Sequence, residues 1–189
     1  MTKAFKPTKA EIAAAAGTTV PDIIAPGLRV LFVGINPSLY SGAVGHHFAR
    51  PGNRFWPVLH LAGFTPSLMS CFDEQQLLEF GLGVTNFVER ATATAEELSA
   101  EELRDGAKRL GQKVCRCQPA YVAVVGVSAY RIGFGRAKAS VGLQPDDVCD
   151  SKVWVLPNPS GLQAHYQLAD MVQLFGELCI AAFGQPPKA

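Results

Sequence analysis

The sequence lacks long apolar runs, a net excess of charge, and any internal repeat. None of its apolar segments approaches the roughly 18 residues that span a bilayer, which excludes an integral membrane protein. The N-terminal segment has early lysines but no apolar core of signal-peptide strength, so we expect a cytoplasmic protein. A net charge of +1 and a hydrophobic fraction of 48% indicate an ordinary globular chain rather than a disordered one.

The five cysteines follow no spacing that is typical of a metal site. Only Cys115 and Cys117 are close, and a single C-x-C lacks the second pair that a zinc or iron–sulfur site needs. We therefore predict reduced thiols and neither a metal nor a cofactor. The adjacent His46 and His47 have no partner cluster either, and we expect them at the surface or in contact with phosphate.

Charge is distributed unevenly along the chain. Residues 73–105 carry nine acids and two bases, whereas residues 106–140 carry seven bases and no acid. Two solvated faces of opposite charge are the simpler interpretation. A basic face that binds phosphate groups is the alternative.

Buried strands alternate with helices along the sequence. Apolar runs that stop at glycine or proline predict three strands, and a shorter run predicts a fourth: residues 28–33, 121–125, 153–156 and 84–87. Apolar residues at helical spacing predict three helices: residues 55–62, 103–117 and 168–182. Thr94 and Glu97 form a capping box that we assign to the second helix. This order predicts an α/β fold, a three-layer sandwich with a central, mainly parallel sheet.

The chain divides into a short arm and one domain. Residues 1–20 are expected to be an N-terminal arm, disordered in part, with a short helix capped by Thr8. Residues 21–189 are expected to form the single domain. In such folds the site lies at the carboxyl ends of the strands.

Two of these strand ends share a pattern, because each is followed by an asparagine, a proline and a serine. The first copy begins at Asn36 and the second at Asn158. A following proline restricts the asparagine to extended backbone conformations, which keeps its amide at the rim of the sheet. A single copy would indicate a turn, whereas two copies at two strand ends indicate a site.

The longer segments around these asparagines resemble a known family. GINPSLYSGAVGHHFARPGNRFWPVLHLAGFTP and VLPNPSGL, with DIIAPGLRVLFVGINPS and GVTNFVERAT, resemble the mismatch-specific uracil-DNA glycosylases, relatives of thymine-DNA glycosylase. The resemblance covers roughly residues 20–183 and implies a uracil-DNA glycosylase-like fold. It implies a monomeric repair enzyme that binds double-stranded DNA with G:U or related mismatches. Such an enzyme flips the uracil out of the duplex, which the chemistry requires, and hydrolyses its N-glycosidic bond.

The resemblance also assigns roles to residues of the first motif. Asn36 holds the attacking water and is the catalytic residue. Phe48 stacks on the flipped pyrimidine, and the backbone amide of Ile35 donates to a uracil carbonyl. Ser38 and Ser41 line the same pocket. Because strict uracil enzymes have a tyrosine at the position of Ser38, we expect thymine or other modified pyrimidines to enter.

The second motif is expected to bind both the base and the duplex. Asn158 lies against the base and sugar, and the following residues form a wedge that fills the hole left by the flipped base. The wedge residues are Ser160, Gly161, Leu162 and Gln163. Glu89 is open to two interpretations, an auxiliary that activates water or a salt bridge at a helix start.

No lysine accompanies the motifs to form a Schiff base, so the enzyme is expected to be monofunctional. Two alternatives stay open from the sequence. One is a broader thymine/uracil glycosylase of the same superfamily. The other is a module that binds mismatches or lesions without cleaving them.

Overall fold

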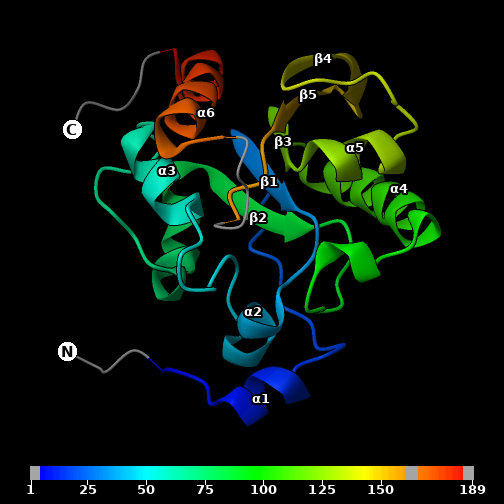
Figure 1. Cartoon of the computed structure of the whole chain (residues 1–189). Helices are drawn as coiled ribbons and strands as arrows, with labels where there is room; N and C mark the ends of the chain where they lie inside the picture. The colour runs from blue at the N-terminus through cyan, green and yellow to red at the C-terminus, as the bar shows by residue number, and fades with distance from the viewer. Residues whose placement is uncertain (1–4, 161–165, 185–189) are drawn as a thin grey trace.

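The computed structural model describes residues 5–160 and 166–184, and within them a five-stranded sheet forms the centre of the molecule (Figure 1). Its strands are β1 (Val30–Gly34), β2 (Leu82–Asn86), β3 (Tyr121–Val125), β4 (Gly142–Val148) and β5 (Ser151–Leu156). Their order is β2-β1-β3-β5-β4, and only β4 runs antiparallel to its neighbour. The α/β fold with a mainly parallel sheet is therefore confirmed.

Helices cover both faces of the sheet. The helical elements are α1 (Lys9–Ala14), α2 (Leu39–Val44), α3 (Phe55–Leu61), η1 (Cys71–Phe80), η2 (Ala95–Glu97), α4 (Ala100–Cys117), α5 (Val127–Gly133) and α6 (Leu168–Phe183). Alternate residues of β1 point to opposite faces, as strand geometry requires. Val30 and Phe32 pack with α3 and α6, whereas Leu31 and Val33 pack with α4 and α5. Both faces of β1 are buried, which explains its continuous apolar sequence.

The strand register aligns the carboxyl ends of the parallel strands at one edge. Gly34 pairs with Asn86 across β1 and β2, and Val125 pairs with Leu156 across β3 and β5. From β1 the chain passes to β2 on one side of β1, and from β2 it crosses over to β3 on the other side of β1. The strand order therefore reverses at β1. Open α/β sheets bind ligands at such a point.

The N-terminal arm includes an ordered helix. Thr8 caps α1 through a capping box with Glu11, as predicted from the sequence. This helix lies beside α2 (Figure 1). Ala15 and Val20 are buried, so the described part of the arm packs against the rest of the chain.

Two local predictions need correction. The Thr94–Glu97 capping box is present, but it begins the separate 3-10 turn η2. Helix α4 starts later, at Ala100, with its own box formed by Ser99 and Glu102. The sequence analysis also missed α2, α5 and β4, which are short or have mostly exposed residues.

The cysteine prediction was wrong for one pair. Cys115 and Cys149 form a disulfide, with their Cα atoms 5.1 Å apart. The fold brings the last turn of α4 beside the turn between β4 and β5, and the sequence separation of 34 residues hides this contact. Cys71, Cys117 and Cys179 are free and buried, as expected for structural thiols.

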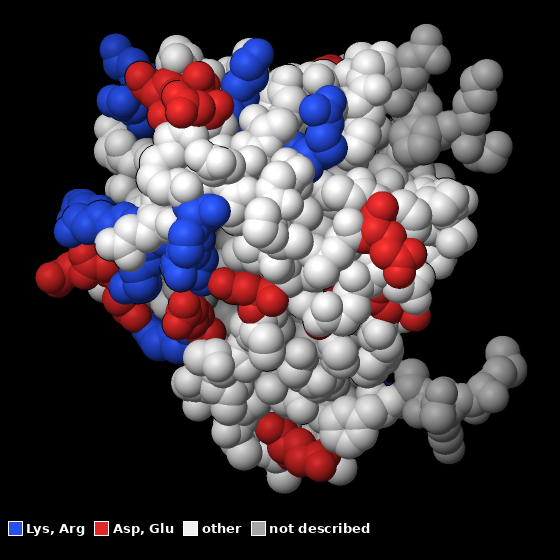
Figure 2. Space-filling model, turned by 180° about the vertical axis from the view of Figure 1, so that it is seen from behind, with Lys and Arg blue, Asp and Glu red and all other residues white. Residues whose placement is uncertain are grey.

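On the side shown in Figure 2, the basic groups toward the left lie next to acidic ones, and further acidic groups lie apart at the right and the bottom. Ion pairs join the two charged segments, because Asp105 lies 2.9 Å from Lys108 and Glu89 lies 3.3 Å from Lys113.

Among the described helices, none is both long and apolar enough to cross a membrane.

Candidate active site

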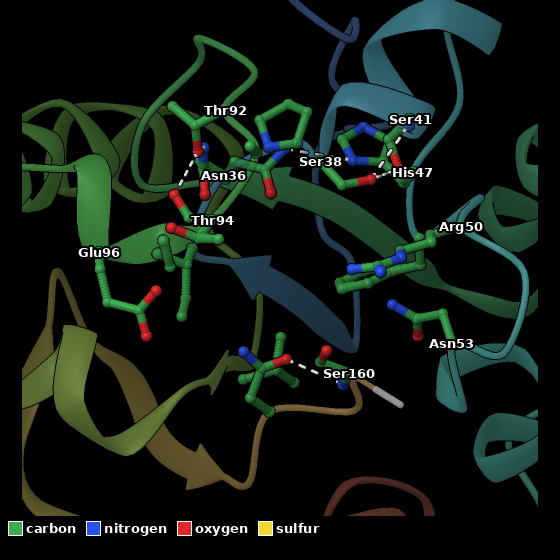
Figure 3. Close-up of a pocket in the computed structure, with 18 residues that line it drawn as sticks. Asn36, Ser38, Ser41, His47, Arg50, Asn53, Thr92, Thr94, Glu96 and Ser160 are labelled. Carbon is green, nitrogen blue, oxygen red and sulfur yellow. Dashed lines mark hydrogen bonds between the residues drawn. The ribbon is translucent and has the colours of Figure 1, made fainter. Parts of the chain in front are cut away.

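A cavity of about 310 Å³ opens at the carboxyl ends of β1, β2, β3 and β5 (Figure 3). It brings together seven of the residues singled out from the sequence: Ile35, Asn36, Ser38, Ser41, Phe48, Asn158 and Ser160. Further lining residues include His47, Arg50, Asn86, Thr92 and Glu96. The two Asn-Pro motifs therefore meet in one pocket, as their positions after parallel strands predict.

Hydrogen bonds fix the amide of Asn36 in one orientation. Its Nδ2 donates to the carbonyl of Arg90 at 3.0 Å. It also donates to Thr92 Oγ1 at 2.6 Å (Figure 3). Thr92 Oγ1 in turn donates to the carbonyl of Thr94 at 2.7 Å. Both hydrogens of the amide are thus used, and Oδ1 accepts no bond within the described chain. The site therefore presents an oxygen acceptor at Asn36.

The amide of Asn158 has the opposite orientation. Its Oδ1 accepts a hydrogen bond from the backbone N–H of Ser160 at 3.0 Å, which is an Asx turn. Because the oxygen is used in this turn, Nδ2 is the polar group that Asn158 can offer a ligand. One Asn-Pro motif thus presents an acceptor and the other a donor.

An aromatic wall is built on the loop after α2. Phe48 has a φ of 52°, in the left-handed region that a non-glycine residue rarely adopts. Its ring stacks on Phe55, with centroids 3.9 Å apart and an interplanar angle of 20°. Since Phe55 covers one face and Phe48 lines the cavity, the other face is offered to a planar ligand.

The two serines shape the same wall from within. Ser38 is the N-cap of α2, and its Oγ accepts from the N–H of Ser41 at 3.1 Å. Ser41 Oγ accepts from the N–H of Ala49 at 3.1 Å, which joins α2 to the loop of Phe48. Both hydroxyls therefore hold the backbone of this wall in place.

The sequence analysis missed a buried pair, His47 and Asn86, and its expectation of an exposed His47 was wrong. His47 is 2% exposed, and its Nε2 lies 2.9 Å from the carbonyl of Pro21. A carbonyl only accepts, so Nε2 carries the proton and Nδ1 accepts from Asn86 Nδ2 at 3.4 Å. Burial lowers the pKa of His47, which favours this neutral form. The signal for Asn86 was its place next to the last residue of the predicted strand 84–87.

Two neighbours hold this pair in position. Glu74 is a buried carboxylate that accepts from the N–H of His47 at 2.8 Å and pairs with His46 Nδ1 at 2.7 Å. His46 is therefore paired and only half-buried. A Cβ atom at Gly34 would clash with Asn86 Oδ1, so any larger residue at the end of β1 would displace the Asn86 amide.

The family model of the uracil DNA glycosylase superfamily matches residues 21–179, which include every strand and the whole pocket. The chain belongs to this superfamily. Membership implies a DNA glycosylase, a repair enzyme that hydrolyses the N-glycosidic bond of uracil in DNA. The match begins after the N-terminal arm.

In this glycosylase the two motifs are joined by Arg54, which sequence reasoning also missed. Its guanidinium donates to the carbonyls of Ser160 and Tyr166, each at 2.8 Å, and its backbone N–H donates to the carbonyl of Pro159 at 2.9 Å. These bonds tie the first motif to both sides of residues 161–165. Gly161, Leu162 and Gln163 of the predicted wedge lie outside the described residues.

Glu89 lies apart from the glycosylase pocket, in an exposed ion pair with Lys113. Its neighbour Arg90 pairs with Glu102 at 2.6 Å in the first turn of α4. The side-chain hydrogen bond from Arg90 is the main cause that lowers the pKa of Glu102 to about 2. Among the described residues, no group of three or more His, Cys, Asp or Glu side chains could hold a metal ion.

Proposed function

We propose that this protein is a monofunctional, mismatch-specific member of the superfamily that removes uracil from G:U mismatches and leaves an abasic site. The observation that best supports this proposal is the fixed orientation of the Asn36 amide. Its Oδ1 acceptor and one face of Phe48 line the same pocket. An amide cannot deprotonate water strongly, but it can hold water in position for attack on C1′. The sugar must then already resemble an oxocarbenium ion before the water oxygen bonds to C1′.

Three side chains support recognition of a flipped pyrimidine. Phe48 offers a ring face for stacking, and Asn158 offers an N–H donor to a base or sugar oxygen. Asn86 uses one hydrogen of Nδ2 on His47 and retains the other hydrogen and Oδ1. This donor–acceptor pair matches the O4 and N3–H edge of uracil.

The small side chain of Ser38 supports a broader range of bases. It caps α2 and leaves the cavity without a bulky group at this position. We therefore include thymine and other 5-substituted uracils opposite guanine as slower substrates. The absence of lysine from the described pocket lining supports hydrolysis by water rather than a Schiff-base route.

The test is single-turnover excision from duplexes that carry uracil, thymine or ethenocytosine opposite guanine or adenine. We expect fastest release of uracil opposite guanine, with alkali-sensitive abasic product. Asn36→Ala should lower this rate on the order of 100-fold and leave duplex affinity nearly unchanged. Tight mismatch binding without release of any base would instead identify a lesion-binding module.

A further inference from the structure

Few groups in the pocket can take a proton from water. Three described lining residues carry an ionisable side chain: His47, Arg50 and Glu96. Arginine stays protonated in proteins, and both ring nitrogens of His47 are engaged by Pro21 and Asn86. Glu96 is therefore the one described lining residue that offers a carboxylate.

The carboxylate of Glu96 differs from those of Glu97 and Glu102, which are both engaged within the chain. Glu97 accepts from the N–H of Thr94 at 3.0 Å, and Glu102 pairs with Arg90. Glu96 makes no hydrogen bond or ion pair within the described chain. Figure 3 shows its carboxylate extending into the open space before the strand ends, on the opposite side of the pocket from Arg50. No bond within the described chain holds it away from a ligand.

The turn that carries Glu96 is joined to Asn36 through one side chain. Thr92 accepts from Asn36 Nδ2 and donates to the carbonyl of Thr94, the N-cap of η2. The N–H of Leu39 also bonds the carbonyl of Thr92, at 3.1 Å. The water-holding amide and the turn that carries the Glu96 carboxylate thus belong to one hydrogen-bonded frame.

We propose that Glu96 is the general base of this glycosylase, an inference that rests on the proposed function. The water held by Asn36 Oδ1 bonds to C1′ through its oxygen, and the C1′–N1 bond breaks. The electron pair of that bond leaves with the uracil anion. The proton of the water passes to the Glu96 carboxylate, directly or across one further water, and is then returned to solvent.

The expected contribution is moderate. General base catalysis gives about 10²- to 10⁴-fold when the base is held firmly. Glu96 is exposed, and the bond to the base is largely broken before water attacks. Both features place the effect at or below the lower limit of that range, about 10- to 100-fold.

The experiment compares Glu96→Gln, Glu96→Ala and Glu96→Asp in the full chain, by single-turnover excision of uracil opposite guanine and by duplex affinity. Glu101→Gln is the matched control, because Glu101 is an exposed acid in the first turn of α4 and does not line the pocket. We expect a loss of about 10- to 100-fold for the Gln and Ala variants, a smaller loss for Asp, and unchanged affinity. Glu101→Gln should stay within about twofold of wild type.

Added formate provides a readout that a structural role would not move. Formate should restore part of the rate of Glu96→Ala, relative to chloride at equal ionic strength, but not that of Asn36→Ala. If the wild type is active and the excision rate of Glu96→Gln lies within twofold of the wild-type rate, this inference is overturned and the proposed function is not. A loss of excision rate in Glu96→Ala that formate does not restore, together with weaker duplex binding, has the same consequence. A wild type that excises no base overturns the proposed function and this inference together.

Discussion

Thr92 offers a direct test of how the orientation of the Asn36 amide supports the reaction. Thr92 is 3% exposed, and its hydroxyl both accepts from Asn36 and donates to the carbonyl of Thr94. Thr92→Val keeps the volume of the side chain but removes both bonds. Asn36 Nδ2 then retains only the carbonyl of Arg90, and the amide turns over more easily.

The magnitude follows from the number of bonds lost. A neutral hydrogen bond contributes about 1 kcal/mol net, and a buried polar group left unpaired costs about 1–3 kcal/mol. The free energy of unfolding should therefore fall by about 1–3 kcal/mol. If the fixed orientation of the amide stabilises the transition state by about 1–2 kcal/mol, its loss lowers the excision rate about 5- to 30-fold.

The assay is single-turnover excision of uracil opposite guanine, with urea denaturation to follow stability. Thr92→Ser keeps the hydroxyl and loses only the methyl group, so it should retain most of the rate. A folded Thr92→Val that is as active as wild type would refute the reasoning. Equal losses in the Val and Ser variants would point to packing rather than the hydrogen bond.

Three further predictions concern stability and specificity. Burial lowers the pKa of His47 from 6.5, so below that pH the unfolded chain binds a proton that the folded chain resists. The free energy of unfolding should therefore fall as the pH is lowered from 7 to 5, and it should fall less steeply in His47→Gln. Equal slopes of unfolding free energy against pH in the two proteins would contradict this. Cys115→Ser should lower the free energy of unfolding by about 2–4 kcal/mol, as expected for a closed loop of this length, and the difference should vanish under reducing conditions. Ser38→Tyr should reduce excision of thymine relative to uracil by about 5- to 150-fold, for an overpacking cost of about 1–3 kcal/mol, and an unchanged ratio would remove Ser38 from base selection.

Most of the sheet could be predicted because its inner strands are largely buried. Strands β1, β3 and β5 appear in the sequence as apolar runs that end at glycine or proline. Edge strand β4 does not, because residues 142–148 include a proline and two aspartates and are mostly exposed. Helix α4 was displaced in the prediction, because Thr94 and Ser99 each begin a valid capping box and only the backbone geometry separates them.

The candidate site was predictable where backbone restriction marks a residue. Asn36 and Asn158 stand before prolines at strand ends, and this placed both in one pocket. Asn86 ends its strand before a phenylalanine and carried no such mark. The capping-box spacing marks Glu97 as the acid that folds back on Thr94, but no sequence signal shows that Glu96 lines the pocket.

The two Asn-Pro motifs show how one sequence pattern provides two different chemical groups. Both asparagines follow buried strands, but the amide of Asn36 gives its hydrogens to Arg90 and Thr92, whereas that of Asn158 gives its oxygen to Ser160. The pocket consequently holds an acceptor suited to water and a donor suited to a departing base oxygen. Neither group is charged, so under the proposed function we expect the rate to depend on amides that are already oriented before the substrate arrives. This dependence is why a single hydroxyl, that of Thr92, is expected to affect the rate through the amide that it orients.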